Sequence, residues 1–145
     1  MLGITNAIIS GIAMSIQGIF NTRLNDKIGI FETTVTVQGI AFLASLIAYF
    51  LFKNGKKYSA IKSVNKLYLL GGILGVVITY TVIKSLSILG ATVGIGIILI
   101  SQLLSAAIID STGMFDSNKI NFTLNNFIGI VLMIIGIIIF QYNRA

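Results

Sequence analysis

The chain has no cysteine, no histidine and no proline among its 145 residues. Without cysteine it forms no disulfide and has no thiolate nucleophile. Without histidine it lacks the usual zinc ligand and the usual proton carrier near neutral pH. Neither a Ser/His/Asp nor a Cys/His arrangement can be assembled, and the phosphate-loop pattern G-x-x-x-x-G-K-[ST] does not occur. We therefore expect no enzyme, no catalytic residue, no metal and no cofactor, although a mechanism that uses carboxylates alone stays open.

Charged residues are scarce as well. They make up 10% of the chain against 56% hydrophobic residues, and the mean hydropathy is +0.99. A soluble domain normally carries about 25% charged residues. Because so few charges cannot cover the surface of a soluble domain, we place the chain in a lipid bilayer. The net charge of +6 does not indicate nucleic acid, since the basic residues flank hydrophobic segments or lie in one loop.

Five hydrophobic segments have the length that a membrane span requires, which is about 20 residues for a hydrocarbon core of roughly 30 Å. They fall near residues 2–22, 31–52, 67–88, 91–110 and 125–142. The third and fourth are nearly continuous, and we place a tight turn between them. No connection is long enough to hold another domain. The sequence therefore predicts one all-α integral membrane domain over residues 1–145, with about five transmembrane helices.

Lysine and arginine are distributed almost evenly over the two membrane sides. With five spans, the side of the N-terminus carries six of them: Lys53, Lys56, Lys57, Lys62, Lys66 and Lys119. The opposite side carries four: Arg23, Lys27, Lys84 and Arg144. The difference, 6 − 4 = 2, places the N-terminus in the cytoplasm only weakly. So small a bias permits insertion in both orientations, or pairing with an oppositely oriented partner.

Polar residues form a stripe along the first segment. Its members are Asn6, Ser10, Gln17 and Asn21. At ~100° per residue they fall within about 60° of one another. Polar side chains are costly at membrane depth, and isolated interhelical hydrogen bonds do not require such alignment. The stripe therefore favours a polar, substrate-binding cavity over simple helix adhesion. Further substrate-binding candidates on other segments are Gln38, Ser101 and Gln102.

Small residues recur at every fourth position in several segments. The first segment has Gly3, Ala7, Gly11 and Ser15, the third has Gly71 and Gly75, and the fourth begins with Gly90 and Gly94. Rows of this kind allow the backbones of two helices to approach closely in lipid. We predict that these glycines and Ser15 are helix-packing positions.

Only four carboxylates are present: Asp26, Glu32, Asp110 and Asp116. Glu32 and Asp110 lie closest to hydrophobic segments, at the expected ends of the second and fourth helices. A carboxylate in a membrane can couple proton movement to transport, which makes these two the proton-coupling candidates. The alternative is that both lie at the interface and remain ordinary solvated anions.

Several short motifs carry a resemblance to a known family. The stretch GIAMSIQGIFNTRL at residues 11–24 resembles the first helix of the YdcZ family, in the drug/metabolite transporter superfamily. Gly29 and Gln102 also fit that family, and residues 109–113, Ile-Asp-Ser-Thr-Gly, look like its Ile-Asp-x-x-Gly element. The resemblance covers nearly the whole chain and rests on the order and spacing of these motifs. Prolines that are usual after the first helix and between the third and fourth are missing here.

This resemblance implies a drug/metabolite-transporter-like half unit in the bacterial cytoplasmic membrane. The implied assembly is an antiparallel dimer with a second copy or with a homologous, oppositely oriented subunit, moving a small-molecule substrate by alternating access. The first segment lacks the mid-membrane glutamate of the small multidrug resistance family, so we expect a small polar solute rather than a polyaromatic cation. Two alternatives stay open: a dual-topology ion channel and a non-transporting membrane subunit.

Overall fold

The computed structural model describes the chain except for residues 1, 53–60, 63, 118, 122 and 143–145 and the side chain of residue 141. The described residues contain helices and no strand. Their principal elements are α1 (Leu2–Ile28), α2 (Ile30–Leu51), η2 (Lys66–Leu70), α3 (Gly71–Leu89), α4 (Ala91–Thr112), η3 (Met114–Asp116) and α5 (Leu124–Tyr142). They group into two compact units, Met1–Ser87 and Ile88–Ala145. The five long helices confirm the all-α prediction.

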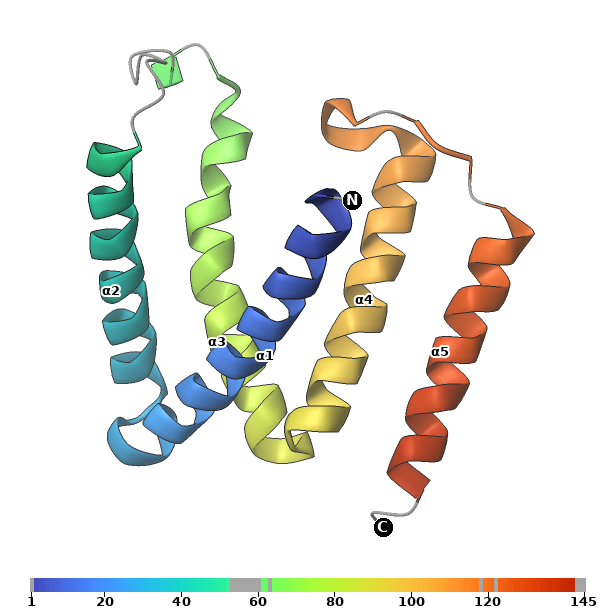
Figure 1. Cartoon of the computed structure of the whole chain (residues 1–145), viewed down its shortest axis with the longest axis horizontal. Helices are drawn as coiled ribbons and strands as arrows, with labels where there is room; N and C mark the ends of the chain where they lie inside the picture. Colours follow the sequence, from blue (N-terminus) through green and yellow to red (C-terminus); the bar gives the residue numbers. More distant parts are fainter. Residues whose placement is uncertain (1, 53–60, 63, 118, 122, 143–145) are drawn as a thin grey trace. The chain divides into compact units, whose positions relative to one another are not determined.

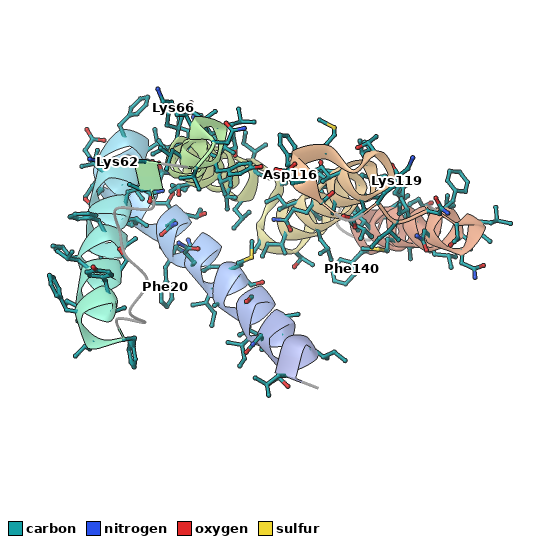
Figure 2. All side chains as sticks on the ribbon, turned by 90° about the horizontal axis from the view of Figure 1, so that it is seen from above. Phe20, Lys62, Lys66, Asp116, Lys119 and Phe140 are labelled. Atoms are coloured by element: carbon teal, nitrogen blue, oxygen red, sulfur yellow. The ribbon has the colours of Figure 1, made fainter. Side chains whose placement is uncertain are left out.

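The helices have the length and composition of membrane spans. Among the described residues, four are long and apolar enough to cross a bilayer: Leu2–Ile28, Ile30–Leu51, Lys66–Leu89 and Ala91–Thr112. The fifth has a shorter apolar stretch, Leu124–Phe140. Large apolar side chains project outward from the helices, for example Phe20 on α1 and Phe140 on α5 (Figure 2). Such exposure suits lipid as solvent and confirms the integral membrane fold.

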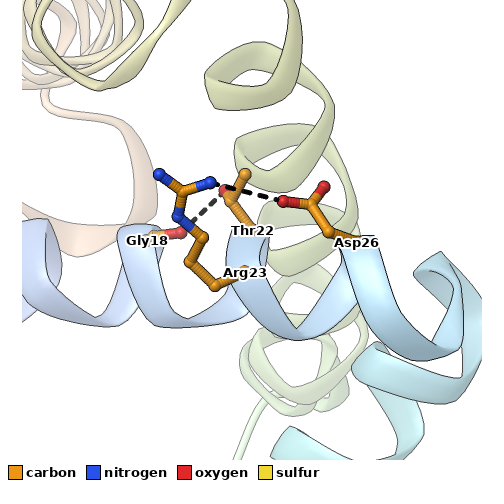
Figure 3. Close-up of polar contacts among 4 residues, drawn as sticks. All are labelled: Gly18, Thr22, Arg23 and Asp26. Carbon is orange, nitrogen blue, oxygen red and sulfur yellow. Dashed lines mark hydrogen bonds and ion pairs between the residues drawn. The ribbon is translucent and has the colours of Figure 1, made fainter.

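The largest difference between the helix ends and the hydropathy boundaries lies at the end of α1. Helix α1 continues to Ile28, six residues beyond the predicted end at residue 22. Its last turns are polar but contain no helix breaker, and Arg23 pairs with Asp26 across one turn at 3.7 Å (Figure 3). Thr22 Oγ1 donates to the Gly18 carbonyl at 2.8 Å in the same turns. Most of the basic 53–66 connection and Arg144, on which the orientation prediction depends, lie outside the described residues.

Two glycines make single-residue turns between long helices. Gly29 separates α1 from α2 with φ 92° and ψ 163°, and Gly90 separates α3 from α4 with φ 76° and ψ 163°. Each glycine carbonyl accepts from the amide four residues later, at 3.0 Å in both cases. This backbone conformation is essentially restricted to glycine. The chain thus uses the same device twice, and Gly90 fixes the turn that the sequence placed only between residues 84 and 91.

The first unit is held together near the α1–α2 turn (Figure 1). A β-carbon at Gly18 of α1 would lie 3.0 Å from Leu86 Cδ2, so α1 and α3 meet closely there. Ile83 of α3 is fully buried. The rings of Phe31 and Tyr80 join α2 to α3 with centroids 5.8 Å apart. By contrast, residues 2–14 of α1 are all exposed in this chain.

The second unit is an antiparallel pair, α4 and α5, joined by a structured connection (Figure 1). Gly113 ends α4 in the left-handed conformation, with φ 71°, as glycine commonly does at a helix C-terminus. The Ile120 amide then donates to the Asp110 carbonyl at 2.8 Å, and Ser117 Oγ donates to the Ile109 carbonyl at 3.3 Å. These bonds tie the connection back to the end of α4.

Glycine at position 96 sets how closely α4 and α5 approach. A β-carbon there would lie 2.8 Å from Ile137 Cδ1 and 3.1 Å from Ile137 Cγ1. We expect Gly96→Ala to lower the free energy of unfolding by about 1–3 kcal/mol, the usual cost of overpacking. Ile137→Val, which removes the nearer atom, should recover part of this loss in the double variant. Unfolding in mixed micelles followed by circular dichroism measures both. Gly129→Ala, in open space, is the control, and an equal loss there would contradict the packing role.

Candidate functional site

The polar stripe of α1 divides into two parts. Asn21 is buried, with 7% of its surface exposed, whereas Asn6, Ser10 and Gln17 are exposed. Asn21 lies in the part of α1 that packs within the first unit, and the other three lie closer to the N-terminus. Within the first unit, Asn21 is therefore the one stripe residue that is enclosed.

The predicted packing positions also separate into groups. Gly3, Gly11 and Gly71 have nothing within 4 Å of an added β-carbon, and Ser15 Oγ donates to the Gly11 carbonyl at 3.0 Å. A β-carbon added at Gly75 would lie 3.5 Å from Gln38 Nε2. Gly94 is buried. Gly90 serves as the turn described above. The close approaches at Gly18 and Gly96 were missed, because nothing in the sequence distinguishes them from other helix glycines.

A chain of hydrogen bonds links α2 to α3. Gln38 Nε2 donates to Thr79 Oγ1 at 3.1 Å, and Thr79 Oγ1 donates to the Gly75 carbonyl at 3.0 Å. Thr79 is buried, with 7% exposed, while Gln38 is half-buried. A β-carbon added at Gly75 would be in ordinary van der Waals contact with the Gln38 amide, so Gly75 lies directly beside this hydrogen-bond chain. The predicted binding residue Gln38 is thus positioned by a threonine that was not among the predicted site residues.

Thr33 and Thr34 lie in the first turns of α2. Their hydroxyl groups differ in hydrogen bonding. Both are buried, Thr33 completely and Thr34 with 6% exposed. Thr34 Oγ1 donates to the Ile30 carbonyl at 2.7 Å. Thr33 Oγ1 is the one buried side-chain oxygen or nitrogen among the described residues that has no hydrogen-bond partner. A buried hydroxyl without a partner is costly, so Thr33 joins the candidate site residues.

The candidates on the fourth helix lie in the second unit. Ser101 and Gln102 are exposed, and Ser101 Oγ donates to the Ile97 carbonyl at 2.9 Å. Asp110 is half-buried in the last turn of α4. Its side chain lines a cavity of about 530 Å³ between α4 and α5.

Glu32 lies in the first turn of α2, and its side chain is exposed. Its carboxylate folds back over the α1–α2 turn, so that Oε2 would lie 2.7 Å from a β-carbon at Gly29. A negative charge in the first turn of a helix is stabilised by the partial positive charge of the free amides there. Glu32 therefore has a structural role at the turn, whatever part it takes in transport.

Groups that could hold a metal ion do not occur in the described part of the chain, where no three acidic side chains come together. In that described part, Arg23 and Asp26 form an ion pair whose side chains are 81% and 48% exposed. The polar side chains buried in the described part of the first unit are the neutral amide and hydroxyl groups of Asn21, Thr33, Thr34 and Thr79. Such groups can form hydrogen bonds to a solute.

The family comparison agrees with this picture. A family model described as "Putative inner membrane exporter, YdcZ" matches residues 2–139, nearly the whole chain, and confirms the resemblance seen in the sequence. Searches of curated proteins and of solved structures returned no match. Apolar helices of membrane length are features of a multi-pass membrane protein, and the family description suggests a transporter rather than an enzyme. The chain belongs to the YdcZ family of membrane exporters.

Proposed function

We propose that the protein moves a small polar solute across the membrane by alternating access, as an antiparallel dimer of two copies of this chain. Asn21, Thr33 and Gln38 of the first unit contribute hydrogen bonds to the solute. Asp110 or Glu32 couples the movement to protons. Gln17 of the same polar stripe and Gln102 on α4 are further contacts to the solute.

The observation that carries this proposal is the buried polar group without a partner. Thr33 Oγ1 is fully enclosed and makes no hydrogen bond to the described chain, and Asn21 is a buried polar side chain of the same unit. A buried hydroxyl such as that of Thr33 costs about 1–3 kcal/mol when nothing binds it. A solute or water that visits the site would recover this energy, which is a physical reason to retain Thr33.

Two features support a dimer. Residues 2–14 of α1 are exposed, including the polar Asn6 and Ser10, and Gly3 and Gly11 offer open backbone for a second helix. Polar groups facing lipid are unfavourable, so a helix of a second copy that covered this half of α1 would stabilise it. The nearly balanced lysine and arginine distribution lets the second copy insert the other way up. Two inverted copies create a site near the midplane that can open to either side in turn.

Counterflow in liposomes that contain only this chain tests the proposal. The solutes are labelled xylitol, serine and ethanolamine, which represent a polyol, a neutral amino acid and a small amine. We expect saturable counterflow of at least one, reduced about tenfold or more in the Gln17→Ala/Asn21→Ala double variant, because two hydrogen bonds are removed. Asn125→Ala, an exposed amide at the start of α5, is the matched control and should leave the rate unchanged.

The same preparation separates the alternatives. Stepwise single-channel currents would identify an ion channel, because carriers do not pass ions fast enough to produce them. Absence of both flux and saturable binding for every solute class would identify a non-transporting subunit. Unchanged counterflow in the double variant would remove α1 from the solute path.

A further inference from the structure

The second unit contains a cavity that the proposed solute site does not use. It has a volume of about 530 Å³, which is in the range of small-molecule sites. The cavity is an open one, lined by α4, α5 and their connection. One face of α4 lines it at positions 103, 106, 107 and 110, and one face of α5 at positions 126, 129, 130 and 133. Both sets have the i, i+3, i+4, i+7 spacing of a single helix face. The small residues Ala106, Ala107 and Gly129 leave the space open.

The cavity is polar at one end and apolar at the other. Because α4 and α5 are antiparallel, the last lining residue of α4 and the first of α5 lie at the same end; these are Asp110 and Asn126. Asn121 of the connection also lines the cavity. Asn126 Oδ1 accepts from Thr123 Oγ1 at 3.0 Å, which holds its amide in place. Leu103 and Met133 lie seven residues away along each helix, about 10 Å at 1.5 Å per residue.

The charge of this cavity is negative. Asp110 is the one ionisable group among the described lining residues, and no ion pair is described for it. The nearby Lys119 of the connection is exposed and does not line the cavity. The carboxylate lies in the last turn of α4, where the helix carbonyls add partial negative charge. The α5 N-terminus opposes this with about half a positive charge, less than the full charge of the carboxylate. The polar end therefore favours a cation.

We propose that this cavity binds an aliphatic monocation, with its ammonium group beside Asp110 and its hydrocarbon chain along Leu103, Ile130 and Met133. Leu103, Ile130 and Met133 give the described lining an aliphatic surface, which is complementary to an alkyl chain. The site is formed within α4, α5 and their connection. It does not depend on the transport proposal, and it can be tested by binding alone.

Methionine methyl NMR gives a direct test, because only four methionines are present and Met133 lines the cavity. The full chain, carrying ¹³C-methyl methionine, is titrated with hexyltrimethylammonium in neutral maltoside micelles. We expect a saturable shift of the Met133 signal. Met14 on α1 is exposed outside the cavity and serves as the internal reference, which should stay unchanged apart from non-saturable micelle effects.

The variants separate charge recognition from simple filling of an apolar space. Asp110→Asn keeps the side-chain size and should weaken binding about tenfold or more, as expected for loss of a charge-assisted contact. Asp116→Asn is the matched control: Asp116 is exposed and does not line the cavity, and asparagine tolerates its φ of 61°. Hexyl sulfate is the anionic control ligand and should not produce the saturable shift.

Three results would overturn the proposal. A Met133 shift that is equal with hexyl sulfate, or unchanged in Asp110→Asn, would mean that the cavity takes up any alkyl chain. Loss of the shift when phosphatidylethanolamine is added to the micelles would assign the cavity to lipid. Absence of any saturable shift would show that no such cation binds.

Discussion

Replacing Gly29 with alanine should lower the free energy of unfolding by about 1–3 kcal/mol, the cost of a backbone conformation that only glycine adopts readily. Gly29 has φ 92° and ψ 163° at the single-residue turn between α1 and α2. The added methyl group would also meet Glu32 Oε2 at 2.7 Å. Unfolding in mixed maltoside and dodecyl sulfate micelles, followed by circular dichroism, measures the loss.

Two matched glycines separate the causes of this loss. Gly90 has nearly the same backbone angles but open space around an added β-carbon, so Gly90→Ala reports backbone strain alone. Gly39 lies inside α2, also with open space around an added β-carbon. Gly39→Ala should raise the free energy of unfolding by up to about 1 kcal/mol, because glycine is unfavourable within a helix. If Gly29→Ala and Gly39→Ala had the same effect on stability, the turn would not depend on glycine.

Thr33→Val should have the opposite effect on stability. The variant removes a fully buried hydroxyl that lacks a hydrogen-bond partner and keeps the branched shape of the side chain. We expect the free energy of unfolding to rise by about 1–3 kcal/mol, the desolvation cost of such a group. Solute counterflow should fall in the same variant, because Thr33 would no longer offer a hydrogen bond to the solute.

Thr34→Val is the control for that experiment. Thr34 is the adjacent residue and is also buried, but its hydroxyl donates to the Ile30 carbonyl at 2.7 Å. Its loss should lower stability by about 0.5–1.5 kcal/mol and leave counterflow unchanged. A Thr33→Val variant that is less stable than the parent chain would contradict the interpretation of Thr33 as an energetically costly site residue.

The fold was predictable from the sequence where local composition decides it. Long apolar runs predict the helices, and the predicted end of the fourth segment at residue 110 lies two residues before the end of α4 at Thr112. The extension of α1 to Ile28 was not predicted, because hydropathy reports burial in lipid and not helix propensity. The positive φ angle of Phe115 could not be read from a residue type that normally avoids this conformation.

The candidate site was predictable in its composition but not in its contacts. The aligned stripe of α1 identified Asn21, yet only the packed structure distinguishes its burial from the exposure of Gln17. Likewise, the partner of Gln38 is Thr79, 41 residues away in the chain. Such pairings depend on how α2 packs against α3, which no local pattern encodes.

The central claim is that two copies of this chain insert in opposite orientations. The absence of native cysteine allows a single reporter, Met114→Cys, at an exposed position in the connection after α4. This neutral substitution leaves the lysine and arginine balance unchanged. In cells that express this chain alone, a membrane-impermeant maleimide should label about half of the molecules from outside, and the rest only after permeabilisation. Labelling of every copy from one side, in a chain that still forms a folded dimer, would contradict the antiparallel assembly.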